Sequence, residues 1–193
     1  GSCFPKDTKA LQPVSKETET PLHLINAVIA VNEAQQVKPL SMVHHYFPNG
    51  IEGLTMAILG TSFKPNTDDI RESSSLKLIE GALNHHAKVS IFDPAAMDNT
   101  KRVFGNQIRY AKNAYDAAKN ADVVVLMTEW NPFRELNFKR LLDKMNGNTL
   151  LDFRGIYKPQ ELQEAGFNVY VIGQTHLNYG SRCNVKGRWS LRT

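Results

Sequence analysis

The chain has 193 residues, 41% of them hydrophobic, which is enough to bury the core of one domain and to carry an appendage. Its formal charge of +4 comes from residues 175–193, which contain four basic and no acidic residues, so the neutral remainder does not suggest a nucleic-acid-binding protein. Two cysteines exclude a disulfide framework or cysteine-ligated metal cluster, and no apolar run approaches the roughly 20 residues of a membrane-spanning helix.

A long helix is predicted near the start of the chain. Residues 22–43 carry apolar side chains at the 3.6-residue helical period, and Pro21 suits the first helical position. Pro39 is expected to kink or end this helix, because proline lacks the N–H that the helix requires. Before it, residues 1–8 are expected to form a loop that contains Cys3.

An α/β pattern follows the turn cluster at residues 47–50. Short apolar runs predict strands at 54–59, 89–92, 121–127, 149–153 and 169–172, and helical spacing predicts helices at 74–87, 114–119 and 159–165. This alternation predicts a Rossmann-like α/β domain with a parallel sheet covered on both faces. In such sheets ligands bind at the carboxyl ends of the strands, so the loops there are the places to look for function.

The sequence thus divides into three parts: a mainly helical segment at 1–47, an α/β domain at 48–174 and a basic tail at 175–193. We expect the tail to be disordered or non-native, in preference to the alternative of a nucleic-acid-binding arm. No signal peptide is visible, so a reduced, cytoplasmic compartment is the expectation.

The first loop that bears chemistry is 60–73, which leaves the first predicted strand. Its single glycine is no dinucleotide fingerprint, which needs three glycines in G-x-G-x-x-G. The loop brings Lys64 and Arg71 toward a helix N-terminus, where free N–H groups favour a phosphate. The alternative is a solvated loop in which Asp68 and Asp69 pair with Arg71.

Two further positions carry reactive or charged groups. Arg154 follows the strand at 149–153 and is expected at the same edge of the sheet as Lys64, unless Asp152 merely pairs with it. Cys3 is a potential nucleophile whose thiol pKa a nearby cation such as Lys6 would lower, although a cysteine near a terminus is more often inert.

Together, several motifs in register resemble the UDP-glucose/GDP-mannose dehydrogenase family, from residue 1 to about residue 173. The motifs are Gly1-Ser-Cys-Phe-Pro-Lys-Asp7, Phe63-Lys64 with Thr67, Asp69 and Arg71-Glu72-Ser73, Asp93-Pro94, Thr128-Glu129-Trp130, and Asp152-Phe-Arg-Gly-Ile-Tyr157. The resemblance implies a UDP-sugar 6-dehydrogenase, first of all one that oxidises UDP-glucose to UDP-glucuronate with two NAD.

The resemblance also implies residue roles. Cys3 would form a thioester with the sugar and Asp7 would assist the hydrolytic water. Contacts to the UDP-sugar would come from Phe4, Phe63, Lys64 and Arg154, and Lys6 and Arg71 would lie near NAD. The 22–43 helix would belong to a central helix that forms a homodimer, and no metal is implied.

We expect the family's amino-terminal NAD-binding domain to lie outside these 193 residues, which is a departure from the family pattern. We therefore expect the chain alone to be inactive but able to bind UDP weakly. Two alternatives stay open: a dehydrogenase of another nucleotide sugar, such as UDP-ManNAc, UDP-GlcNAc or GDP-mannose, and a nucleotide-binding module without catalysis. Asp93 is expected to be a structural turn residue, and Trp130 a packing residue.

Overall fold

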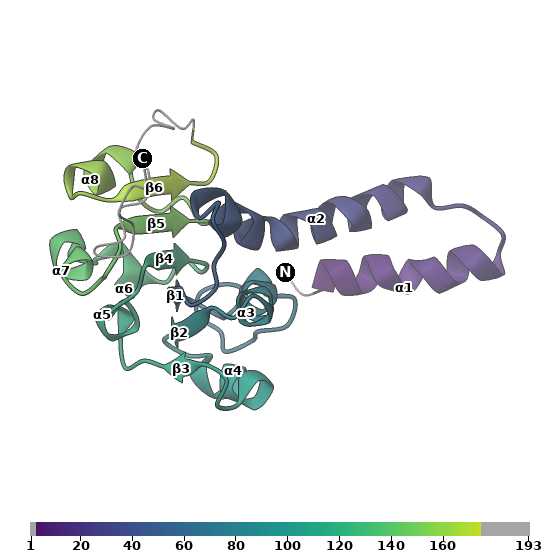
Figure 1. Ribbon diagram of the computed structural model, residues 1–193. Coiled ribbons are helices and arrows are strands. Elements are labelled where there is room, and N and C mark those ends of the chain that lie inside the picture. The colour runs from purple at the N-terminus through teal and green to yellow at the C-terminus, as the bar shows by residue number, and fades with distance from the viewer. Residues whose placement is uncertain (1–2, 175–193) are drawn as a thin grey trace.

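A six-stranded parallel sheet forms the centre of the computed structural model, which describes residues 3–174 except for the side chains of Cys3, Phe4 and Lys16 (Figure 1). The strands are β1 (Thr55–Leu59), β2 (Lys88–Phe92), β3 (Arg109–Tyr110), β4 (Val123–Leu126), β5 (Thr149–Asp152) and β6 (Asn168–Val171). Their order, β3-β2-β1-β4-β5-β6, is that of a doubly wound fold and confirms the predicted α/β class. The expected tail at 175–193 lies outside the described residues.

Helices cover both faces of the sheet. They are α3 (Ser74–Asn84), α4 (Met97–Phe104), α5 (Ala114–Ala117), α6 (Asn131–Arg134), α7 (Phe138–Leu142) and α8 (Pro159–Glu164). One layer contains α3 and α4, and the other contains α5 to α8 (Figure 1). None of the described helices is both long and apolar enough to cross a bilayer.

Alternate side chains of each strand enter two separate cores. In β1, Met56 and Ile58 pack into the core beneath α3 and α4, whereas Ala57 and Leu59 pack into the core beneath α5 to α8. All four are at most 1% exposed. Because both faces are buried, the strands are continuous apolar runs, which is why sequence patterns detected them.

Two helices precede the domain and form a hairpin, here called the arm: α1 (Cys3–Glu17) and α2 (His23–Tyr46). The expectation of a loop around Cys3 was wrong, because Cys3 is the first residue of α1. Pro5 is tolerated within the first turn, where a backbone N–H has no intrahelical acceptor. The hydroxyl of Thr8 donates to the carbonyl of Pro5 at 3.1 Å, and Thr8 is buried.

The second arm helix docks on the domain through its carboxyl-terminal half. Pro39 was expected to kink or end it, but α2 continues to Tyr46. Leu40 approaches Gly81 of α3 so closely that a Cβ on Gly81 would lie 2.3 Å from the Leu40 side chain. The Tyr46 hydroxyl donates to the carbonyl of Val169 in β6 at 2.9 Å. These tertiary contacts compensate for the hydrogen bond that proline cannot make, a defect that costs about 3 kcal/mol.

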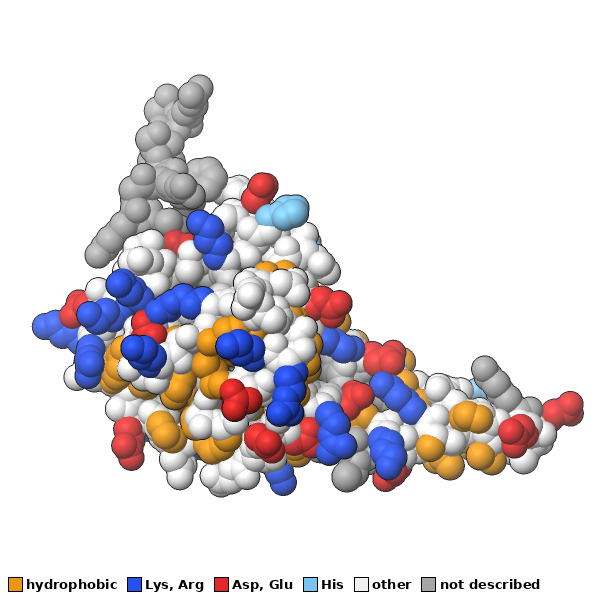
Figure 2. Space-filling view, turned by 90° about the horizontal axis from the view of Figure 1, so that it is seen from below, with side chains coloured by type: hydrophobic (Ala, Val, Ile, Leu, Met, Phe, Trp, Pro, Cys, Tyr) orange, Lys and Arg blue, Asp and Glu red, His pale blue; other side chains and the backbone are white. Residues whose placement is uncertain are grey.

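The outer half of the arm exposes apolar side chains (Figure 2). Leu24 is 77% exposed and Val31 62% exposed. Both belong to the periodic stripe that predicted the helix, so this stripe is not the face that packs on the domain. Ile29, Pro39 and Val43 are the buried residues of α2.

The elements that sequence patterns missed are short. Strand β3 has two residues, one of them Arg109, and offers no apolar run to detect. Helices α6 and α7 have four and five residues, fewer than a periodic pattern requires. Helix α4 has eight residues but few apolar ones.

Candidate functional site

The site is built at the carboxyl ends of β1 and β4, the neighbouring strands at which the strand order reverses. Gly60 directly follows β1 and has φ +92°, and a Cβ there would lie 2.5 Å from the Cβ of Thr128, which follows β4. Its N–H donates to the carbonyl of Phe92 at 2.9 Å. Only glycine satisfies both the positive φ and this close approach.

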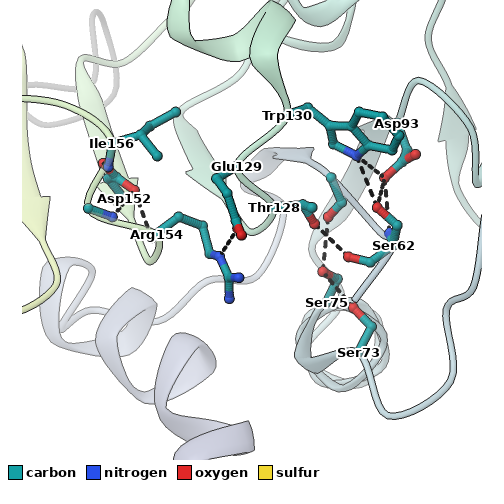
Figure 3. A network of polar contacts seen from close by, with 12 residues as sticks. Ser62, Ser73, Ser75, Asp93, Thr128, Glu129, Trp130, Asp152, Arg154 and Ile156 are labelled. Atoms are coloured by element: carbon teal, nitrogen blue, oxygen red, sulfur yellow. Dashed lines mark hydrogen bonds and ion pairs between the residues drawn. The ribbon is translucent and has the colours of Figure 1, made fainter. Parts of the chain in front are cut away.

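The backbone after Gly60 is held by a buried carboxylate, that of Asp93 (Figure 3). Its Oδ2 accepts the N–H groups of Thr61 at 2.7 Å and Ser62 at 2.9 Å, and also the Ser62 hydroxyl at 2.9 Å. Its Oδ1 accepts the N–H groups of Ala95 and Ala96. The expected structural role of Asp93 is therefore confirmed.

These same hydrogen bonds decide whether the first loop fits a dinucleotide. In a dinucleotide-binding loop the N–H groups after the first strand are directed at the pyrophosphate. Here the N–H groups of Thr61 and Ser62 are occupied by Asp93, and one glycine takes the place of three. The loop after β1 therefore does not fit the pyrophosphate of NAD.

The segment after β4 is bonded to the same loop. Thr128 donates its hydroxyl to the carbonyl of Ser62 at 2.6 Å, and the indole N–H of Trp130 donates to the Ser62 hydroxyl at 3.0 Å. Both donors are buried. Trp130 packs into the core as expected, and its indole also joins a polar network that the sequence did not reveal. This network joins the two loops through hydrogen bonds between buried groups.

The outer part of the β1–α3 loop contains an ion pair. The carboxylate of Asp69 accepts hydrogen bonds from Arg71, from Nε at 2.9 Å and from Nη2 at 2.8 Å. Hydrogen bonds from Arg71 lower the pKa of Asp69. The arginine side chain is 78% exposed, so this pair stabilises the fold by at most about 1 kcal/mol. Arg71 and Asp69 thus pair within the loop, which is the alternative that the sequence left open.

A second buried carboxylate closes the end of β5. Asp152 is 0% exposed and accepts four backbone N–H groups, from Arg154, Gly155, Ile156 and Tyr157, at 2.8–3.1 Å. Burial raises the pKa of Asp152 above its ordinary value, although the four donors act in the opposite direction. Its carboxylate thus accepts the Arg154 backbone N–H, while the Arg154 guanidinium donates through Nε to Glu129.

A cavity of about 260 Å³ lies between these loops and the arm. Its lining includes Pro5, Asn32, Gln35, Gln36, Phe63, Glu72, Ser73, Ser74, Met127 and Arg154. The residues come from α1, α2 and the segments after β1, β4 and β5. Two predicted site residues, Phe63 and Arg154, therefore share one cavity although 91 positions separate them in the sequence.

The remaining predicted site residues are distributed around the loop and the arm. Lys64 is exposed, with Nζ 5.5 Å from the centroid of the Phe63 ring. Lys6 and Asp7 are exposed on α1, immediately after the cavity-lining Pro5. The side chains of Cys3 and Phe4 lie outside the described part of the structure.

The polar residues of the arm that line the cavity were not predicted from the sequence. Gln36 donates Nε2 to Glu72 at 3.2 Å, and Nζ of Lys9 lies 3.7 Å from the same carboxylate. The signal available was a cluster of polar side chains at 32, 35 and 36, three and four residues apart on an otherwise apolar helix. Within residues 3–174 no group of three side chains is arranged to hold a metal ion.

Comparison with known proteins agrees with this geometry. Residues 57–159 match the UDP binding domain of the UDP-glucose/GDP-mannose dehydrogenase family. A UDP-glucose 6-dehydrogenase of Rhizobium meliloti (strain 1021) is 37% identical over 174 residues, which cover 90% of this chain and 40% of the relative. A UDP-glucose 6-dehydrogenase of Pseudomonas aeruginosa is 34% identical over 184 residues, or 93% and 41% of the two chains.

Solved structures show the same fold. A UDP-glucose dehydrogenase from Pyrobaculum islandicum superposes with a TM-score of 0.74 at 27% identity, over 89% of this chain and 36% of that one. The chain spans about 40% of the length of the curated relatives that it matches. Since the family match covers more than half of its residues, the chain belongs to the UDP-glucose/GDP-mannose dehydrogenase family and contains the family's UDP-binding domain.

Proposed function

We propose that the chain is part of an NAD-dependent UDP-sugar 6-dehydrogenase and that its cavity binds the nucleotide end of the substrate, UDP-glucose in the first instance. One observation carries the proposal. The cavity is lined by Phe63 and Arg154 at the strand ends and by Pro5, two residues from Cys3 in the same helix. A nucleotide site and the segment with the potential nucleophile thus adjoin each other.

The reaction assigns a separate task to each group of this chain. Lys64 and Arg154 supply positive charge for the diphosphate, and Phe63 an apolar ring for the nucleotide. The Cys3 thiolate adds to the C6 aldehyde, and its sulfur stays bonded to C6 through the second oxidation to a thioester. Asp7 accepts a proton from the water that hydrolyses the thioester, which releases the carboxylate and the free thiolate.

NAD supplies the hydride acceptor when bound. The loop after β1 does not fit its pyrophosphate, so we assign the main NAD-binding surface to a further domain, in the part of the relatives that this chain does not span. Lys6 and Arg71 are exposed, follow or precede the cavity-lining Pro5 and Glu72 in the sequence, and are proposed to approach NAD from this side. The chain alone is then expected to produce no NADH from UDP-glucose.

Isothermal titration of this chain with UDP tests the proposal. We expect weak but saturable binding that Arg154→Ala or Lys64→Ala reduces about tenfold, which is the effect of losing one charge-assisted contact. Lys119→Ala is the matched control, because Lys119 is exposed and precedes β4 at the opposite end of the sheet. Absence of binding at millimolar UDP, or equal losses in all three variants, would overturn the nucleotide assignment.

The catalytic assignment needs the complete enzyme. There Cys3→Ala is expected to abolish turnover while the affinity for UDP is retained, because the sulfur acts on C6 and not on the nucleotide. Turnover by Cys3→Ala would remove Cys3 from the mechanism. A panel of UDP-glucose, UDP-ManNAc, UDP-GlcNAc and GDP-mannose on the complete enzyme identifies the substrate.

A further inference from the structure

Glu129 lies beside the Arg154 guanidinium, and no part of the proposed function uses it. The two side chains form an ion pair through Nε of the arginine and are 34% (Arg154) and 28% (Glu129) exposed. Arg154 lines the cavity, whereas Glu129 is not among the described residues that line it. The carboxylate thus contacts the arginine without being part of the cavity wall.

The backbone that carries Glu129 is held on both sides. Its neighbours Thr128 and Trp130 are buried and both donate hydrogen bonds to Ser62, as Figure 3 shows. The Arg154 backbone is fixed as well, because its N–H donates to Asp152 at 2.8 Å. The ion pair therefore joins two segments that are each held by hydrogen bonds, one after β4 and one after β5.

Ionisation of Glu129 is maintained in this setting. Burial raises the pKa of Glu129, but the hydrogen bond and charge of Arg154, a backbone hydrogen bond of Glu129 itself and the charge of Arg134 together outweigh it, so the pKa lies below its ordinary value. Glu129 is therefore a carboxylate at neutral pH. A negative charge beside an anion site repels the ligand, so its presence requires a compensating benefit.

Orientation of the arginine is that benefit. An unrestrained arginine side chain loses rotamer entropy when it is fixed by a ligand. Glu129 uses only Nε, which leaves the N–H groups of both Nη atoms for a second partner. In Figure 3 the Nη end points away from Glu129, and Arg154 lines the same cavity as Ser73.

We propose that Glu129 is a positioning residue that holds the Arg154 guanidinium ready for the diphosphate of a nucleotide sugar. The inference rests on the proposed function, since it assumes that Arg154 contacts the nucleotide. It adds that the pair is kept when the ligand binds, with Glu129 on Nε and phosphate oxygens on the Nη atoms.

Titration of UDP into variants of the whole chain tests this inference, because orientation and simple repulsion predict opposite signs. We expect Glu129→Ala to weaken UDP binding about fivefold or more, the size expected when a charge-assisted pair is lost. Glu129→Gln keeps an acceptor oxygen for Nε and is expected to restore binding to within about threefold of the parent. If Glu129 only repelled the ligand, both variants would bind UDP more tightly.

A double-mutant cycle separates positioning from a structural role. Adding Glu129→Ala to Arg154→Ala is expected to cause no further loss, because the carboxylate then has no guanidinium to orient. Glu135→Ala is the matched control, since it removes an exposed carboxylate six positions away and should leave UDP binding unchanged. Thermal unfolding midpoints establish that each variant folds. If Glu129→Ala does not fold, Glu129→Asp takes its place, because it retracts the carboxylate by one methylene and is expected to lose affinity despite its charge.

The outcomes distinguish the two proposals. Parent-like or tighter binding by Glu129→Ala, with clear loss in Arg154→Ala, overturns the inference alone. Additive losses in the double variant do the same, because they indicate independent effects. If Arg154→Ala binds UDP as the parent does, both the proposed function of this cavity and the role of Glu129 are overturned.

Discussion

Two buried aspartates, Asp93 and Asp152, act in the same way at two strand ends. Each lies at the carboxyl end of its strand, is at most 1% exposed and accepts at least four hydrogen bonds from nearby loops. A buried carboxylate is costly unless its oxygens are satisfied, and here backbone N–H groups satisfy them. The loops after β1 and β5, which carry the proposed ligand contacts, are thereby fixed without using the side chains that face the cavity.

Replacing Asp152 by Asn is expected to destabilise the fold. The Asn side chain keeps one acceptor oxygen and places an N–H₂ group against two of the four N–H donors. Leaving two buried donors without acceptors costs about 2–4 kcal/mol. Chemical denaturation at neutral pH measures the loss. Asp143→Asn is the control, because Asp143 is exposed and its replacement should change stability by less than about 0.5 kcal/mol; equal effects would show that the Asp152 hydrogen bonds contribute little.

At the scale of elements, helix α3 ends with a non-glycine residue, His86, at a position that glycine usually occupies. The N–H of Ala87 donates to Ala82 and that of His86 to Leu83, both at 2.9 Å, which is the Schellman pattern of helix termination. His86 has φ +57°, a conformation that glycine adopts without steric cost. The exposed imidazole therefore occupies a strained backbone position.

His86→Gly is accordingly expected to stabilise the protein by up to about 1 kcal/mol, because relief of strain exceeds the added freedom of the unfolded chain. A rise of a few degrees in the thermal unfolding midpoint would be seen. His85→Gly is the matched control: His85 has φ −98°, so no strain is relieved, and its ring contact with His44 is lost. A decrease in stability for both variants would contradict the strain argument.

The contact between α2 and α3 includes a histidine pair that makes stability depend on pH. The rings of His44 and His85 lie 4.7 Å apart, and burial first and the charge of His85 second lower the pKa of His44 from 6.5. Because the unfolded chain binds this proton at higher pH than the folded chain, stability is present above about pH 6.5 and is lost as pH falls toward the folded-state pKa. His85→Gln should reduce that loss.

Denaturant midpoints at pH 7.5 and pH 5.5 measure this dependence. The midpoint of the parent should be lower at pH 5.5 than at pH 7.5, and this difference should be smaller in His85→Gln. His23→Gln is the control, since His23 is exposed at the start of α2. If His85→Gln and His23→Gln change the difference equally, the pair is not its source.

The sequence predicted the elements whose signals are local. Five of the six strands were predicted because buried parallel strands are continuous apolar runs, and the two-residue β3 was missed because it has none. The helical form of the Cys3 segment was missed because α1 is stabilised by packing on α2 and contains prolines that argue against a helix.

Parts of the candidate site were predictable for a different reason. Phe63 and Arg154 could be placed near one another because parallel strands bring their carboxyl ends to one edge. The bonds of Ser62 with Asp93, Thr128 and Trp130 join positions 31 to 68 residues apart, and such pairings of polar groups leave no periodic trace in a sequence. Pairing of Arg154 with Asp152 was weighed only as an alternative, and the observed partner of its guanidinium, Glu129, left no signal in the sequence for the same reason.

For the whole molecule, the arm carries both part of the cavity wall and an exposed apolar surface. Its inner end lines the cavity through Pro5 and Gln36, and the arm as a whole carries five of the six exposed large apolar side chains among the described residues. Such a concentration on one projection is typical of a protein–protein contact. We propose that a second copy of the chain covers it, in line with the predicted homodimer.

Introducing a charged side chain among the exposed apolar residues of the arm should therefore separate the two copies. Leu24→Glu and Val31→Glu are each expected to convert a dimer to a monomer in sedimentation velocity, because a carboxylate buried in an apolar interface costs several kcal/mol. Val103→Glu is the matched control: Val103 is 54% exposed on α4, outside the arm, and its replacement should leave the dimer intact. A parent chain that is monomeric at all concentrations would show that the stripe does not pair copies of this chain. Dissociation by Val103→Glu as well would move the contact to the domain.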